Sequence, residues 1–100
     1  MERSALLSDF FRAIANDPTI GVSHISLYCA LLRNFEDNGG VDPLPIIKNE
    51  LMRSAKISGK ATFHKCISDL HSLGYIRYQP SHNYRKKSKV FLYSKLTYKN

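Results

Sequence analysis

Apolar residues recur at helical spacing in four segments of this 100-residue chain. Side chains three and four positions apart share one face of a helix, so each segment predicts an amphipathic helix with a buried stripe. The stripe residues are Leu7, Phe10, Phe11 and Ile14; Leu27, Tyr28, Leu31, Leu32 and Phe35; Ile47, Leu51 and Ala55; and Phe63, Cys66, Ile67, Leu70 and Leu73. The chain is therefore expected to be mainly helical, with these residues in its core.

Turn signals delimit the first two helices. Asn16-Asp17-Pro18 is expected to end the first helix, which covers residues 3–16. Ser23 is placed to cap the second helix, because its hydroxyl can accept from a backbone N–H of the first turn. Asn38-Gly39-Gly40 has the residue types of a left-handed cap and should end that helix. Residues 41–44 are then expected to be extended, since each proline disfavours a helical predecessor.

A helix, a short turn and another helix are expected next. Pro45 suits the first position of the third helix, and Lys56-Ile57-Ser58-Gly59-Lys60 breaks it. Ser58 is the expected cap of a fourth helix, which runs from about Lys60 to Leu73 and is closed by Gly74.

Two strands follow the helices. Tyr75-Ile76-Arg77-Tyr78 and Val90-Phe91-Leu92-Tyr93 are rich in β-branched and aromatic residues, and the connection between them is basic. They predict a hairpin with a charged loop. The expected class is thus α+β, mainly α with a small β-hairpin, in a chain with room for one small domain.

Charge is distributed unevenly along the chain. Residues 1–50 carry four Lys or Arg against seven Asp or Glu, whereas residues 51–100 carry eleven against the single acid Asp69. A basic face of this kind suits a polyanion, and we favour nucleic acid because a charge that serves only solubility would be dispersed. An anionic membrane surface fits less well, since no basic amphipathic helix accompanies the charge.

Other classes of function lack their residues. Cys29 and Cys66 stand within helical patterns and are expected to be buried, reduced thiols. His64 and His71 are seven positions apart, which does not bring two rings together for a metal ion. No nucleophile and base spacing and no phosphate-binding glycine loop supports an enzyme or a cofactor. Without an apolar run of about 20 residues or a secretory signal, we expect a cytoplasmic protein.

The order of the elements resembles the winged helix-turn-helix family over residues 20–94. The most telling segment is Leu51 to Thr62, in which a helix ends on a small residue, an Ile-Ser turn follows, and a Thr stands in the first turn of the next helix. A Leu-Gly-aromatic-Ile step, Leu73-Gly74-Tyr75-Ile76, then leads toward the wing. The chain looks most like small stand-alone regulators that mobile elements often encode. The helix over 3–16 is an addition to the minimal domain.

The resemblance implies double-stranded DNA as the partner, with a recognition helix in the major groove and a basic wing on the backbone or in the minor groove. Expected contacts from the helix and its preceding turn are Ser58, Lys60, Thr62, His64, Lys65 and Ser68. Those from the wing are Tyr84, Arg85, Lys86, Lys87 and Lys89. The alternatives are an ordinary solvated helix face and a charged hairpin that avoids pairing with other sheets.

We therefore expect a sequence-specific DNA-binding protein, a transcriptional regulator that is not an enzyme and has no small-molecule ligand. A replication-initiation or excision accessory factor of a mobile element is an alternative, as is a winged helix that binds a protein. Residues 1–19 are expected to form a helix for packing or dimerisation, and residues 20–100 the DNA-binding domain. A homodimer through the first helix is weighed because two-fold symmetric DNA sites favour dimers.

Overall fold

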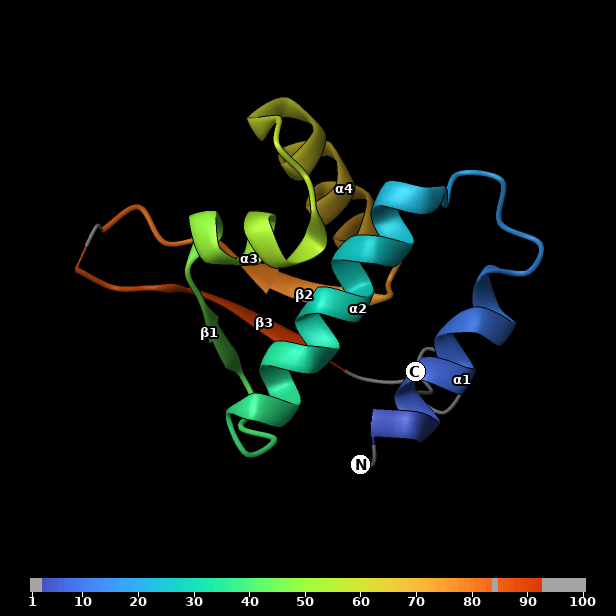
Figure 1. Ribbon diagram of the computed structural model, residues 1–100, viewed down its shortest axis with the longest axis horizontal. Helices are drawn as coiled ribbons and strands as arrows, with labels where there is room; N and C mark the ends of the chain where they lie inside the picture. Colours follow the sequence, from blue (N-terminus) through green and yellow to red (C-terminus); the bar gives the residue numbers. More distant parts are fainter. Residues whose placement is uncertain (1–2, 84, 93–100) are drawn as a thin grey trace.

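The computed structural model describes residues 3–83 and 85–92, which form four helices and three strands (Figure 1). The helices are α1 (Arg3–Ile14), α2 (Val22–Asp37), α3 (Lys48–Ala55) and α4 (Lys60–Ser72). The strands are β1 (Leu44–Ile46), β2 (Ile76–Gln79) and β3 (Ser88–Leu92). The class is α+β, with a mainly helical body and a small antiparallel sheet.

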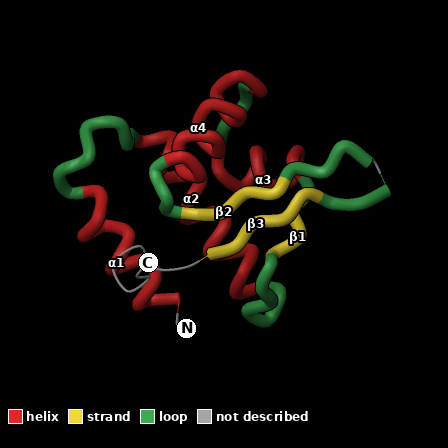
Figure 2. Tube along the Cα trace, turned by 180° about the vertical axis from the view of Figure 1, so that it is seen from behind, coloured by secondary structure: helices red, strands yellow, loops and turns green. Residues whose placement is uncertain are grey.

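The sheet contains the expected hairpin and one strand more. Strand β3 lies between β1 and β2, in the order β1-β3-β2, and Leu44 pairs with Val90 while Ile76 pairs with Leu92. These four side chains are buried, whereas Arg77 and Lys89, which are the neighbours of Ile76 and Val90 along their strands, are exposed. Figure 2 shows the helices on one side of this sheet. The sheet is therefore apolar toward the helices, and its other side carries polar residues.

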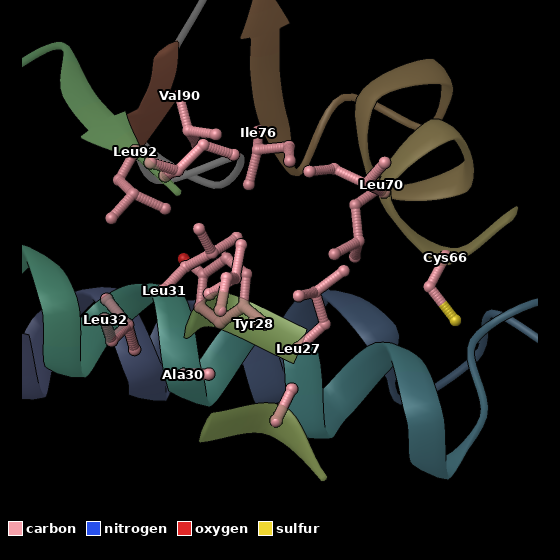
Figure 3. Packing of buried hydrophobic residues seen from close by; sticks show 14 of the residues in the cluster. Leu27, Tyr28, Ala30, Leu31, Leu32, Cys66, Leu70, Ile76, Val90 and Leu92 are labelled. Carbon is pink, nitrogen blue, oxygen red and sulfur yellow. The ribbon is translucent and has the colours of Figure 1, made fainter. Parts of the chain in front are cut away.

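The core lies between α2, α4 and the sheet (Figure 3). Its fully buried members include Leu27, Tyr28, Leu31, Phe63, Ile67, Leu70, Ile76 and Val90. The predicted stripes of α2 and α4 account for most of this set, and Phe35 and Leu73 are partly buried at its margin. Because α4 buries one side against α2 and the sheet, its opposite side faces solvent.

Helix α1 packs on the same core through most of the predicted stripe, since Phe10 is buried and Leu7 and Ile14 are partly buried against the core. Phe10 is 3% exposed and stacks on Tyr28 with 3.8 Å between ring centroids, while Tyr75 meets Phe10 edge-on. Leu6 is also buried, but Phe11 is 45% exposed. The prediction is thus wrong for Phe11, and it missed Leu6. The helix is turned so that Leu6 and Phe10, one turn apart, enter the core.

Neither serine cap forms. Helix α2 begins at Val22 after Gly21, whose N–H donates to Nδ1 of His24 at 3.0 Å. The imidazole of His24 thus accepts from the N–H of the cap residue Gly21, and the Ser23 hydroxyl does not cap the helix. Helix α4 begins after Gly59, and its end has no side-chain cap, so Ser58 is not the cap.

Three further expectations are corrected. Pro45 lies in β1, not at the start of a helix, because Leu44 and Ile46 alternate into the core and a proline fits an edge strand. Ile47 precedes α3 and is 42% exposed, so it is not a core residue. Cys29 is exposed, since its position on α2 faces away from α4 and the sheet. Cys66 is buried as predicted, and burial raises the pKa of its thiol.

The predicted helix ends after α2 and α4 are confirmed. Gly39 and Gly40 follow α2 with positive φ, and Gly74 follows α4 at φ 85°. There the N–H of Gly74 donates to His71 O and the N–H of Tyr75 to Leu70 O, which satisfies carbonyls at the helix end. The chain then enters β2, so this turn sets the position of β2 relative to α4.

Candidate nucleic-acid interface

Helix α4 presents polar side chains to solvent because its apolar stripe is buried. Phe63, Ile67 and Leu70 are at most 1% exposed and hold the helix against the body of the protein. The predicted contact residues on α4 are all exposed, as is the residue in the turn before it: Ser58, Lys60, Thr62, His64, Lys65 and Ser68. They provide ammonium, hydroxyl and imidazole groups along one helix face.

The β2–β3 loop forms the second exposed group. Arg85, Lys86, Lys87 and Lys89 are exposed, with Lys89 in β3 itself. Local bonds shape the loop: the N–H of Arg85 donates to Asn83 Oδ1 at 2.9 Å, and the N–H of Lys86 donates to Asn83 O at 2.9 Å. Tyr84, the remaining predicted contact of the wing, lies outside the described residues. The loop therefore holds several cations close together by backbone turns.

An open hollow of about 860 Å³ lies along this loop. Its border combines Pro45 of β1 with Pro80, Ser81 and His82 and with the cations of the loop. Within the described residues, 3–83 and 85–92, no ion pair joins Lys86 or Lys87 to a carboxylate. Like charges gathered without a counter-ion repel one another, so this surface favours an anion.

The two exposed groups both lie away from α1. Figure 1 shows the start of α4 at the top and the β2–β3 loop at the left, with α1 on the opposite side. His71 joins the end of α4 to β2, because its Nδ1 accepts from the N–H of Tyr78 at 3.0 Å. The structure thus brings the helix and the hairpin into contact, while the N-terminal helix lies away from both.

Lys65 is tied to a carboxylate. Its Nζ lies 2.9 Å from Oδ2 of Asp69, one turn later on α4, and Nε2 of His24 lies 2.8 Å from the same oxygen. The hydrogen bond from His24, followed by that from Lys65, lowers the pKa of Asp69, and Asp69 in turn raises the pKa of Lys65. Sequence reasoning missed this group: the four-residue spacing of Lys65 and Asp69 was the available signal for their pair, whereas His24 comes from a distant segment and gave none.

Sequence reasoning missed two cations beside the turn between α3 and α4. Arg53 and Lys56 are exposed and border a hollow of about 440 Å³ with Ser58. They also border a second hollow, of about 420 Å³, with Arg33 of α2. Their charge and their position beside the turn were the available signals. They extend the basic surface from α4 toward α3.

Hydrogen-bond donors and cations dominate this surface, which suits phosphate oxygens and base edges. Among the described residues, no three His, Cys, Asp or Glu side chains form a group that could hold a metal ion. No helix in the described ranges has the length and apolar character needed to cross a membrane. No protein-family profile, curated protein or solved structure matches the chain.

Proposed function

We propose that the chain is a sequence-specific double-stranded DNA-binding protein of the winged helix-turn-helix type. The observation that carries the proposal is the joint exposure of the polar side of α4 and the basic β2–β3 loop on one part of the molecule. An α-helix fits the major groove of B-DNA, and adjacent cations neutralise phosphates. In this assignment α4 is the recognition helix and the loop is the wing.

The arrangement of the elements supports the same assignment. Helix α3, a turn over residues 56–59 and α4 are followed by β2 and β3, and β1 precedes α3 as a third strand. Helix α2 packs behind α3 and α4, which leaves the outer side of α4 uncovered. A winged helix that binds protein shares this order, but the excess of cations at residues 53–89 favours a polyanion.

The decisive experiment selects duplexes that bind the full chain from a random library. A regulator should enrich one sequence, and mapping that sequence to a promoter, an origin or an element end separates a regulator from a replication or excision factor. Absence of binding to any duplex would overturn the proposal. Binding without enrichment would replace sequence-specific recognition by non-specific, architectural binding.

A matched pair of variants tests α4 on the selected duplex. Replacing Thr62 with alanine should cost about 1 to 3 kcal/mol there if a base contact is lost, and much less on random DNA. Thr19→Ala, in the exposed connection between α1 and α2, removes the same atoms away from α4 and should change neither affinity. Similar losses for the two variants would exclude α4 as the reading helix.

A further inference from the structure

The one carboxylate of residues 51–100 lies on the proposed recognition helix. Asp69 is about 25% exposed in its side chain and stands one turn after Lys65. A carboxylate at a surface that approaches DNA repels phosphates, so Asp69 opposes binding there even though it is also the acceptor for His24. Its presence beside the cations of the same helix therefore calls for a function.

Asp69 cannot easily turn away from this position. His24 is only 7% exposed, and its Nδ1 accepts from the N–H of Gly21, so its Nε2 carries the hydrogen and donates to Asp69. Movement of Asp69 would leave a buried imidazole N–H without its acceptor, which is costly. The carboxylate is thus fixed from the inside of the protein.

Lys65, unlike Asp69, is not held in place by the interior of the protein and can leave the ion pair. Its side chain is 71% exposed, and its ammonium uses one of its three donors on Asp69. While that bond is kept, the carboxylate offsets the attraction of the ammonium to an anionic phosphate, whereas the remaining donors can still bond to a neutral acceptor such as guanine O6 or N7. The fixed carboxylate therefore penalises backbone contacts by Lys65 more than base contacts.

We propose that Asp69 is a specificity-determining residue, which holds Lys65 for base contact and lowers its binding to the phosphates of non-target DNA. The inference rests on the proposed function and deepens it. Asp69 would increase discrimination between sequences. It lowers the affinity for every sequence by opposing phosphate contact, but only the target offers Lys65 a base contact that compensates for this loss.

The test compares Asp69→Asn with the wild-type chain on the selected duplex and on a random duplex of equal length, across a range of salt. The amide keeps an oxygen for His24 but loses the charge that holds Lys65. Affinity for the random duplex should rise roughly three- to tenfold, and the slope of log affinity against log salt should steepen by about 0.9, one phosphate more. The selected duplex should gain less, so the ratio of the two affinities falls.

Asp37→Asn is the matched control. Asp37 pairs with Arg33 one turn earlier on α2, at 3.6 Å, in the same order of cation and acid, and its loss changes the net charge equally. This variant should leave the ratio of affinities unchanged. An equal rise for both variants would show that only net charge matters and would overturn the inference.

Lys65→Gln provides a second route that leaves the buried His24–Asp69 pair in place. It should weaken binding to the selected duplex clearly and binding to random DNA by less than about twofold, because Lys65 makes little phosphate contact while Asp69 holds it. Equal losses on both duplexes would contradict the inference, as would an unchanged ratio in Asp69→Asn. Failure of the wild-type chain to bind any duplex would instead contradict the proposed function.

Discussion

Three hydrogen bonds at His24 and Asp69 join the start of α2 to α4. The N–H of Gly21, the two ring nitrogens of His24 and a carboxylate oxygen form a continuous chain, which ends on the exposed ammonium of Lys65. Its inner part is shielded from water, so the bonds there are stronger than those of an exposed pair. A single titratable group on the outer helix is thereby coupled to the packing of α2.

This coupling predicts a pH dependence of stability. The folded protein holds the pKa of Asp69 below its ordinary value, so the unfolded chain binds a proton more readily at that residue. Its contribution is present above about pH 5 and is lost as the pH falls through the acid range. The difference in melting temperature between wild type and Asp69→Asn should therefore be largest near pH 6 and shrink toward pH 3.

Thermal unfolding of both proteins at several pH values measures this difference, and the other carboxyl groups cancel because both chains carry them. A difference that stays constant with pH would show that Asp69 contributes only the shape of its side chain. Helical spacing was enough to predict that the proposed contact residues of α4 are exposed. The partner His24 was not, because 45 residues separate it from Asp69 and no local pattern links them.

The β2–β3 loop is the element whose charge is most concentrated. Replacing Arg85, Lys86 and Lys87 with alanine should weaken binding to every duplex and flatten the salt dependence by up to roughly 2 to 3 units, since each cation neutralises one phosphate at most. Specificity should largely survive, because these side chains are expected to contact the phosphates of the DNA and not its bases. Binding titrations at several salt concentrations give the slope.

A control variant with the same change in net charge replaces Arg3, Arg12 and Lys48, which lie on α1 and at the start of α3. It should leave the slope nearly unchanged. Two equal slopes would mean that the total charge of the protein, not its placement on the loop, determines binding.

Elements differed in how well local sequence predicted them. Helices α2 and α4 formed as expected, since long stripes and glycine ends agree. Strand β1 did not emerge from the sequence because it is three residues long and exists only by pairing with β3, more than 40 residues away. Pro45 has the same physical chemistry at a helix start and at a strand edge, so the tertiary pairing decides between them.

At the scale of the whole molecule, the N-terminal helix α1 lies apart from the basic surface. Helix α1 lies on the side opposite the β2–β3 loop in both Figure 1 and Figure 2. Helical spacing predicted Phe10 in the core, and its contacts with Tyr28 and Tyr75 turn α1 so that Leu6 is buried and Phe11 is exposed. This orientation could not come from spacing alone, because it depends on aromatic residues of α2 and the start of the hairpin.

The same orientation predicts the oligomeric state. Leu6 and Phe10 are already buried within the chain, which leaves Phe11 as the large exposed apolar side chain of α1 in the described part, and single exposed aromatics are ordinary on monomers. We expect a monomer in sedimentation equilibrium at micromolar concentration, and a selected DNA site without two-fold symmetry.

Two alanine variants test this account. Phe10→Ala should destabilise the protein by about 3 to 5 kcal/mol, because it empties a packed aromatic site, and Phe11→Ala by less than about 1 kcal/mol. Neither should change the sedimenting mass. If the wild-type chain sediments as a dimer and Phe11→Ala separates it into folded monomers, then α1 serves association through its exposed side. In that case the two recognition helices would act as a pair, and the target should be a palindrome whose half-sites are about one helical turn apart.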